Sequence, residues 1–327
     1  MKPLSLSRWL AAAALASTLA SASFSSQAAF SGLYVFGDSV SDSGNNALAI
    51  GINASQVITG NGYVPIQPYA SGVYSNGPVW ATSFASALGL GAVPSLAGGG
   101  NFAFGGATTG TDGAAGGFPP SLRSQLNLYL GGSGGVAAPG ALYVIAGGGN
   151  NVRTVLEAIG GGAPPVATIA SAAAGYANDV GAMVDALQAA GAANIVVWNT
   201  PNVGATPAAA SQGTLAQFFG TAAANSFNSA LAARLAGESG VMSFDVFGLF
   251  TAVGASPGAY GLTNITDACG AVLGCDASKY LFWDGLHPTA AGHLVLANAL
   301  IAVVPEPQSY LLFSAGILMM LVWCRRA

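Results

Sequence analysis

The sequence predicts an α/β fold, a three-layer α/β/α sandwich in which a parallel sheet of five strands lies between two layers of helices. Three observations support this prediction. Short runs rich in β-branched and aromatic residues alternate with longer alanine-rich runs, as in parallel strands joined by crossover helices. Only 6% of the residues are charged and 52% are hydrophobic, which indicates a globular chain. No repeat with a period of about 20 to 50 residues is visible, which argues against a solenoid or a propeller.

The elements can be placed in chain order from these runs. The predicted strands are short apolar runs: Leu33–Phe36, Asn101–Phe104, Ala141–Ala146, Asn194–Asn199 and Val241–Phe244. The predicted helices are longer runs between or after them: Pro78–Leu88, Ser121–Leu130, Val166–Ala190, Thr214–Ala236 and Thr289–Val303. Glycine-rich stretches separate several of these elements, and Pro288 suits the entry to the last helix.

The first 28 residues are predicted to be a secretory signal peptide. Lys2 and Arg8 are followed by an apolar run that ends at Ala22, and small residues then continue to Ala29, with cleavage expected after Ala28 or Ala29. This order is typical of an export signal and fits a first core helix less well. We therefore expect an exported protein whose folded domain occupies residues 29–303.

Residues 304–327 are predicted to be a sorting signal. Pro305-Glu306-Pro307 precedes an apolar stretch that would span about 25 Å as a helix, slightly less than a bilayer core. Arg325 and Arg326 follow and would hold that end in the cytoplasm. This order resembles the PEP-CTERM signal of Gram-negative bacteria that secrete exopolysaccharide. The resemblance implies a membrane helix, transient association with the inner membrane, processing by an exosortase-type enzyme and a final place in the periplasm, at the cell surface or in the extracellular matrix. A retained membrane anchor is the alternative.

The charge of the predicted domain excludes several partners. The two terminal segments hold four of the eight Lys and Arg residues but only one of the twelve Asp and Glu residues. The remaining acidic body lacks the basic stripe that binding to nucleic acid requires. None of the glycine-rich stretches has the G-x-x-x-x-G-K-[ST] pattern of a phosphate loop. We expect no nucleic-acid partner and no nucleotide.

A serine, a histidine and an aspartate with complementary chemistry stand at the two ends of the domain. Ser39 follows the first predicted strand directly, in Phe36-Gly37-Asp38-Ser39, and His287 is one of only two histidines. Asp284 precedes His287 by three residues. A serine nucleophile needs a base to take its proton, and the base needs an acid that fixes its tautomer. We predict Ser39, His287 and Asp284 for these roles, and we expect His293, six residues further, to be structural.

Two further motifs follow the second and third predicted strands. Gly105-Gly106 and Asn150 should lie near Ser39, because ligands bind beyond the carboxyl ends of the strands in open parallel sheets. Acyl transfer places negative charge on the substrate carbonyl oxygen, which needs preorganised donors. A glycine N–H and an asparagine amide both suit that task.

These four motifs, in this order, resemble the GDSL esterase/lipase family, also called SGNH hydrolases. The resemblance implies a flavodoxin-like sheet and a carboxylic ester hydrolase that needs no metal or organic cofactor. It makes Ser39 the nucleophile, Asp284 and His287 the acid and base, and Ser39, Gly106 and Asn150 the donors of the oxyanion hole. The choice of Gly106 rests on its distance from Asn101 in the family pattern. Asn151 stands where many members carry aspartate.

Cys269 and Cys275 are predicted to form a disulfide. Five residues separate them in a segment just before Asp284. In an exported protein this pairing is favoured over a metal site, because no Cys or His cluster surrounds the pair. A loop this small gains little chain-entropy stability, so its expected effect is to restrain the segment that leads to Asp284.

Several alternatives stay open. Taken singly, Ser39 and Asn150 are also typical helix caps, and Asp284 with His287 is also a plausible loop ion pair. Phe104, Phe282 and Trp283 are candidates for an acyl pocket or for core packing. The substrate is a small acyl ester or an acylated polysaccharide, and the sorting signal motivates an exopolysaccharide O-deacetylase as the alternative. The rival class is a non-catalytic surface or matrix protein on the same fold.

Overall fold

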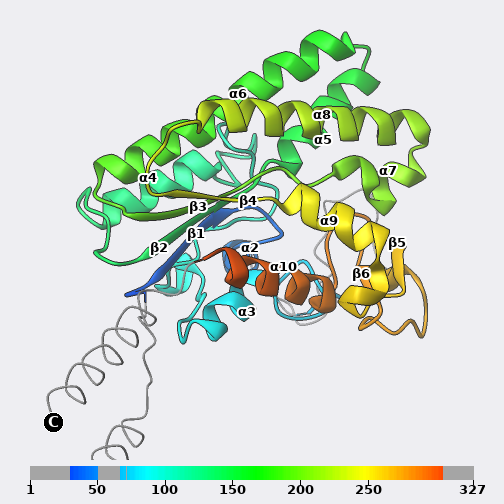
Figure 1. Cartoon of the computed structure of the whole chain (residues 1–327), viewed down its shortest axis with the longest axis horizontal. Coiled ribbons are helices and arrows are strands. Elements are labelled where there is room, and N and C mark those ends of the chain that lie inside the picture. Colours follow the sequence, from blue (N-terminus) through cyan, green and yellow to red (C-terminus); the bar gives the residue numbers. More distant parts are fainter. Residues whose placement is uncertain (1–29, 51–66, 71, 305–327) are drawn as a thin grey trace, which may run out of the picture. The chain divides into compact units, whose positions relative to one another are not determined.

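The computed structural model describes residues 30–50, 67–70 and 72–304 (Figure 1). The predicted signal peptide lies outside the described residues, and so does the predicted sorting signal with its membrane helix, apart from Val304. Within the described ranges no helix is both long enough and apolar enough to cross a membrane. The described residues form the predicted α/β domain.

The centre of the domain is a parallel sheet of four strands. They are β1 (Leu33–Gly37), β2 (Leu142–Ala146), β3 (Asn194–Trp198) and β4 (Val241–Phe244). The strands lie side by side in chain order, with Val35 opposite Val144 in the first pair. They read as almost continuous apolar runs because helices cover both faces of the sheet.

The second predicted strand, Asn101–Phe104, is not a regular strand. The segment lies along the free edge of β1, where Phe102 N–H donates to Val35 O at 2.8 Å and Phe104 N–H donates to Gly37 O at 3.2 Å, but its pairing is limited to isolated bridges from Asn101 to Val35 and to Pro94. The Asn101 Oδ1 accepts the Ala103 N–H at 2.9 Å, while the Phe102 and Phe104 N–H groups donate to β1. The five-stranded layout is therefore corrected to four strands with this segment at the edge.

Helices pack on both faces of the sheet and make three layers (Figure 1). Side chains that alternate along the strands point to opposite faces: Phe36 and Tyr143 pack in one core, and Val35 and Val144 in the other. The first core is covered by α4 (Leu122–Gly132), α5 (Gly149–Gly160), α6 (Pro165–Ala189) and α8 (Thr214–Arg234). The second is covered by α3 (Trp80–Ala87) and α10 (Ala290–Val303).

The five predicted helices correspond to α3, α4, α6, α8 and α10. Four further helices were not predicted: α2 (Asn45–Ile50), α5, α7 (Pro207–Ser211) and α9 (Val246–Ala255). α5 is amphipathic but short and bounded by glycine at both ends, whereas α9 is apolar almost all round its axis and so lacks the usual helical pattern. Asp245 nevertheless caps α9 by accepting the Gly248 N–H at 2.8 Å.

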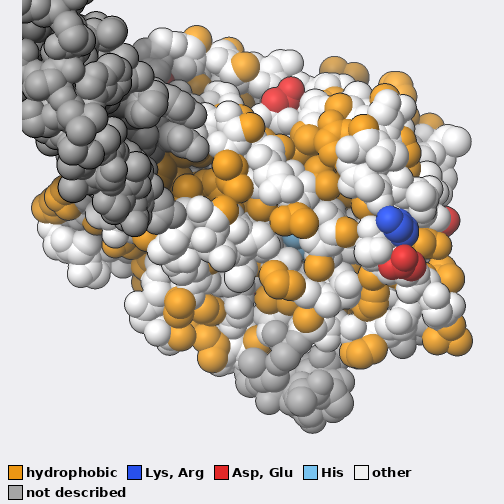
Figure 2. All heavy atoms as spheres, turned by 60° about the horizontal axis from the view of Figure 1, so that its bottom comes forward, with side chains coloured by type: hydrophobic (Ala, Val, Ile, Leu, Met, Phe, Trp, Pro, Cys, Tyr) orange, Lys and Arg blue, Asp and Glu red, His pale blue; other side chains and the backbone are white. Residues whose placement is uncertain are grey.

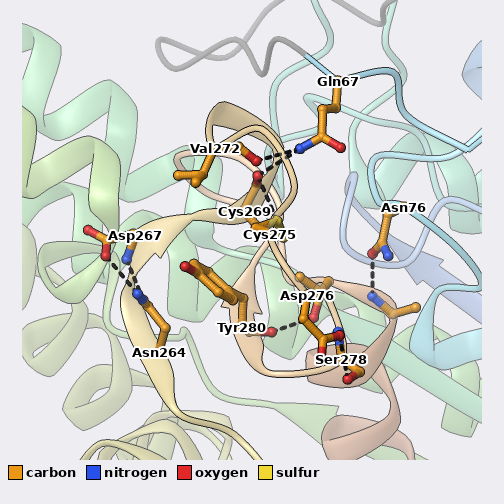
Figure 3. The surroundings of a disulfide bond; sticks show 12 residues. Gln67, Asn76, Asn264, Asp267, Cys269, Val272, Cys275, Asp276, Ser278 and Tyr280 are labelled. Carbon is orange, nitrogen blue, oxygen red and sulfur yellow. Dashed lines mark hydrogen bonds between the residues drawn. A yellow bond between two sulfur atoms is a disulfide. The ribbon is translucent and has the colours of Figure 1, made fainter.

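A second, two-stranded sheet leads into the Asp284 segment. Its strands are β5 (Asn264–Ala268) and β6 (Tyr280–Phe282), which run parallel and lie beside α9 in Figure 1. The structure joins Cys269 and Cys275 by a disulfide in the connection between them (Figure 3). The carboxyl ends of β1 to β4 and the end of β6 together surround the predicted site.

Candidate active site

Ser39 lies in a tight turn at the end of β1. Gly37 has no room for a side chain, because a Cβ there would lie 2.7 Å from Ala146 O and 2.8 Å from Ser41 Oγ. The turn is closed by Asp38, whose backbone oxygen accepts from Ser41 N and whose Oδ1 accepts from Val40 N, both at 3.0 Å. Ser39 is thereby held at the carboxyl end of the strand and is 8% exposed.

The three residues predicted as nucleophile, base and acid form one hydrogen-bonded chain. His287 Nε2 lies 2.7 Å from Ser39 Oγ, and His287 Nδ1 lies 2.6 Å from Asp284 Oδ2. The other carboxylate oxygen, Asp284 Oδ1, accepts the backbone N–H groups of Leu286 and His287, each at 2.7 Å. Ser39 and His287 are 248 residues apart in sequence, so only the tertiary fold brings them into contact.

The environment of Asp284 favours its charged form. Burial alone would raise its pKa, but the charge of His287 and the hydrogen bonds from His287 and Tyr69 hold the pKa below its usual value. An ionised carboxylate accepts the Nδ1–H of His287, so Nε2 carries the lone pair that faces Ser39. This tautomer is the one that removes a proton from a serine hydroxyl.

The predicted oxyanion donors come from three segments: the turn after β1 (Ser39), the Gly105-Gly106 loop and the first turn of α5 (Asn150). The N–H groups of Ser39 and Gly106 donate to no acceptor within the described ranges, and Gly106 has a φ of +84°, which suits glycine. The Asn150 side chain donates one N–H to Ala107 O at 3.0 Å, which links it to the residue after Gly106 and leaves its second N–H. These groups are available to a substrate oxygen.

The turn that carries Ser39 also fixes the Gly105-Gly106 loop. Asp42 accepts the Gly105 N–H at 3.0 Å, and the Asn46 side chain donates to Gly105 O at 3.1 Å. The Asn45 side chain donates to Ala103 O at 2.9 Å. Asp42 thus links the turn of the predicted nucleophile to the loop of one predicted oxyanion donor.

Asn150→Ala is expected to lower kcat by roughly 100-fold or more, with a smaller effect on KM, as for loss of one oxyanion donor. The reason is that negative charge on the carbonyl oxygen develops only in the transition state. Steady-state kinetics with a p-nitrophenyl ester measure the effect. Asn151 is the matched control: its side chain contacts Thr109 instead of the cavity, so Asn151→Ala should retain kcat within a few-fold. An unchanged kcat in Asn150→Ala would remove Asn150 from the mechanism.

An open cavity begins at Ser39 and His287. Its empty volume is about 1100 Å³, including the part that opens to solvent, and Asn150 lines it whereas Gly106 does not. Most of its wall is apolar, with side chains from several parts of the fold: Val40, Val203, Val246, Phe250, Ile265, Leu281, Phe282 and Leu286. Figure 2 shows a face on which hydrophobic side chains surround a partly visible histidine and few charges occur.

The structure resolves the open assignments among the nearby aromatic residues. Phe282 lines the cavity. Phe104 instead packs edge-on against Phe118, and Trp283 packs in a small core with Tyr69 and Cys269. His293 is fully buried and its Nδ1 accepts the Trp80 N–H at 3.2 Å, which is a structural contact.

Two residues near the site were not predicted from the sequence. Tyr69 donates its hydroxyl to Asp284 Oδ2 at 2.5 Å across 215 residues of sequence, and no local motif marks it. Arg153 lines the cavity, and its Nη1 lies 3.4 Å from Asn150 Oδ1. As to metal ligands, the described part of the chain contains no cluster of three or more His, Cys, Asp or Glu side chains suited to an ion.

Comparisons with known proteins identify the family of this chain. Residues 33–300 match the family described as GDSL-like Lipase/Acylhydrolase. A protein of Pseudomonas putida described as "Uncharacterized protein in trpE-trpG intergenic region" is 31% identical, over 91% of this chain and 52% of the relative. The chain thus spans about half the length of that relative. Because the family match covers most of the chain, the protein belongs to the GDSL-like lipase/acylhydrolase family of esterase/lipase-type hydrolases.

Proposed function

We propose that this protein is a serine esterase that hydrolyses carboxylic acyl esters. The observation that carries the proposal is the continuous hydrogen-bonded chain from Ser39 Oγ through His287 to Asp284. His287 removes the Ser39 proton as Oγ attacks the ester carbonyl carbon, and the ionised Asp284 stabilises the imidazolium that forms. The proton then passes from His287 to the alcohol as the ester C–O bond breaks.

Water completes the cycle on the resulting acyl-enzyme. His287 takes a proton from water as its oxygen attacks the acyl carbon, and returns it to Ser39 Oγ as the carboxylic acid leaves. In both halves the N–H groups of Ser39 and Gly106 and the side chain of Asn150 hold the oxyanion. Each step balances in protons without a metal or an organic cofactor.

The cavity supports an ester with an apolar acyl chain. Its wall includes residues that follow each strand in turn: Ser39 after β1, Asn150 after β2, Val203 after β3 and Val246 after β4. Three strand spacings amount to about 14 Å, which is the length of an extended acyl chain of about ten carbons. This wall favours an acyl ester over the exopolysaccharide O-deacetylase alternative, because an acetyl group would leave most of it empty.

Action outside the cytoplasm is part of the proposal. The signal-like residues 1–28 indicate export, and the PEP-CTERM-like residues 304–327 indicate processing by an exosortase-type enzyme. The Cys269–Cys275 disulfide agrees with an oxidising compartment.

Hydrolysis of p-nitrophenyl acetate, butyrate, octanoate and decanoate by the full chain tests the proposed function. Release of p-nitrophenol with a preference for the longer esters is the expected result, because the apolar wall contacts more of a longer chain. Acetate release from acetylated exopolysaccharide without turnover of the longer esters would favour the deacetylase. No turnover and no labelling of Ser39 by a fluorophosphonate would favour the non-catalytic rival.

Gly254→Leu is expected to shorten the acyl chain that the enzyme accepts. Gly254 is in α9 and lines the cavity, and a Cβ there would lie 3.8 Å from its nearest neighbour, Ile265 Cδ1. A leucine therefore fits the helix but fills the space before Ile265. We expect kcat/KM for the decanoate ester to fall roughly 10- to 100-fold, and that for acetate to change less than about twofold.

Gly258→Leu is the matched control for this prediction. A Cβ on Gly258 meets nothing within 4 Å, and Gly258 does not line the cavity. Its chain-length profile should match that of the wild type. A uniform loss over all chain lengths in Gly254→Leu would contradict an acyl pocket at this position, and a change seen only in a series of alkyl acetates would assign the cavity to the alcohol.

A further inference from the structure

We propose that Tyr69 is a positioning residue for the acid Asp284, and that the disulfide loop, residues 269–275, holds Tyr69 in place. The proposal rests on the proposed function, because Asp284 matters only if His287 is the base. It concerns residues outside the four sequence motifs.

Tyr69 and His287 share one oxygen of the acid. The Tyr69 hydroxyl donates to Asp284 Oδ2 at 2.5 Å, and His287 Nδ1 lies 2.6 Å from the same atom. Tyr69 is 6% exposed and Asp284 is fully buried, so water does not easily replace the phenol. A carboxylate oxygen has two lone pairs, and these two donors can occupy both.

This sharing has a chemical consequence. A hydrogen bond from a neutral phenol stabilises the carboxylate and takes up part of the negative charge on Oδ2. The charge that Oδ2 offers to a protonated His287 is therefore smaller than it would be without Tyr69. Tyr69 also restrains Oδ2 of the carboxylate, because the N–H groups of Leu286 and His287 hold Oδ1.

The disulfide loop supports Tyr69 through Gln67. The Gln67 side chain donates to Cys269 O at 3.1 Å and to Val272 O at 2.8 Å (Figure 3). The Gln67 backbone N–H donates to Gly270 O at 3.0 Å. Three acceptors within the loop thus fix the residue two positions before Tyr69.

The same loop also contacts the segment that carries the acid. Gly270 N–H donates to Trp283 O at 2.7 Å, one residue before Asp284. Cys269, Tyr69 and Trp283 pack together in one buried cluster. The loop therefore contacts both the segment that carries Tyr69 and the segment that carries Asp284, and the Cys269–Cys275 bond limits how far its carbonyl groups can move.

Tyr69→Phe in the full chain tests the positioning role. Without the phenol, one donor to Oδ2 is lost, so Oδ2 offers more of its negative charge to His287 Nδ1. We expect the acid limb of the pH profile of kcat/KM to move upward by about half a pH unit or more, and kcat to fall about three- to tenfold with KM nearly unchanged. The downfield proton NMR resonance of the His287 Nδ1–H should also shift.

Tyr280→Phe is the matched control. Tyr280 packs in the same cluster, and no hydrogen bond of its hydroxyl occurs within the described ranges. It should leave the acid limb and the NMR resonance as in the wild type. An acid limb and a resonance in Tyr69→Phe that both coincide with those of the wild type would overturn the positioning role.

The double variant Cys269→Ser/Cys275→Ser tests the link to the loop. We expect a smaller shift of the acid limb in the same direction, and no further shift when Tyr69→Phe is added, because both changes act on one hydrogen bond. A shift that persists undiminished in the Tyr69→Phe background would overturn the link. If the wild type hydrolyses no ester, the proposed function fails, whereas the NMR comparison still tests the contact of Tyr69 with the acid.

Discussion

Ser39→Ala is expected to lower ester hydrolysis by roughly 10⁴-fold or more while the domain stays folded. The Ser39 hydroxyl is the one group of the proposed mechanism that forms a covalent bond to the substrate, and its Oγ lies 2.7 Å from His287 Nε2. Alanine removes this nucleophile but leaves the N–H of residue 39, Gly106 and Asn150 in place. The remaining activity should come from binding and from the oxyanion donors alone.

The measurement compares turnover and fluorophosphonate labelling in Ser39→Ala and in a second serine variant of the same turn. Ser43 donates its hydroxyl to Ala92 O at 2.7 Å and does not line the cavity. Ser43→Ala should therefore keep both turnover and labelling. Equal turnover by Ser39→Ala and the wild type would refute the serine mechanism.

His287→Ala is expected to cause a loss of similar size, because Ser39 then has no base. The same change at the other histidine separates chemistry from structure. Burial lowers the pKa of His293 to about 3, so that side chain stays neutral, and it contacts Trp80 rather than Ser39. His293→Ala should reduce stability by about 2 kcal/mol through a buried void and an unpaired N–H, yet retain most of the kcat of the folded protein.

Both histidine variants are assayed well below their melting temperatures, with circular dichroism as the measure of folding. The double variant Ser39→Ala/His287→Ala should be no worse than either single variant, because the two residues act as one unit. A loss in folded His293→Ala equal to that in His287→Ala would show that the wrong base was chosen.

Much of the site was predictable from sequence because its residues follow strands directly. Ser39 and Asn150 come at the ends of apolar runs that became β1 and β2, and neighbouring parallel strands end at one edge of the sheet. The pairing of Asp284 with His287 is local, since three residues separate them. Local sequence patterns were therefore enough to predict where along the chain these residues stand and which edge of the sheet they approach.

Other features depended on contacts between distant segments. The segment 101–104 has the composition of a strand and donates two N–H groups to β1, but it pairs only through isolated bridges. The cavity wall combines side chains from α9, β5 and β6. Of these elements, α9 is apolar almost all round its axis and shows no clear hydrophobic period in the sequence. Such walls are set by packing, which overrides local propensity.

The sequence by itself determined the α/β class, the four motifs and the candidate nucleophile, base, acid and oxyanion donors, because periodicity and residue chemistry are local properties. The tertiary structure alone decided the four-stranded sheet, the apolar cavity from β1 to β4 and the contact of Tyr69 with Asp284. That contact joins residues that are 215 positions apart in the sequence. Gln67, two positions before Tyr69, is in turn bonded to the disulfide loop. A single tyrosine carries no pattern that reveals such a partner, whereas burial of both groups in the folded domain favours a hydrogen bond between them.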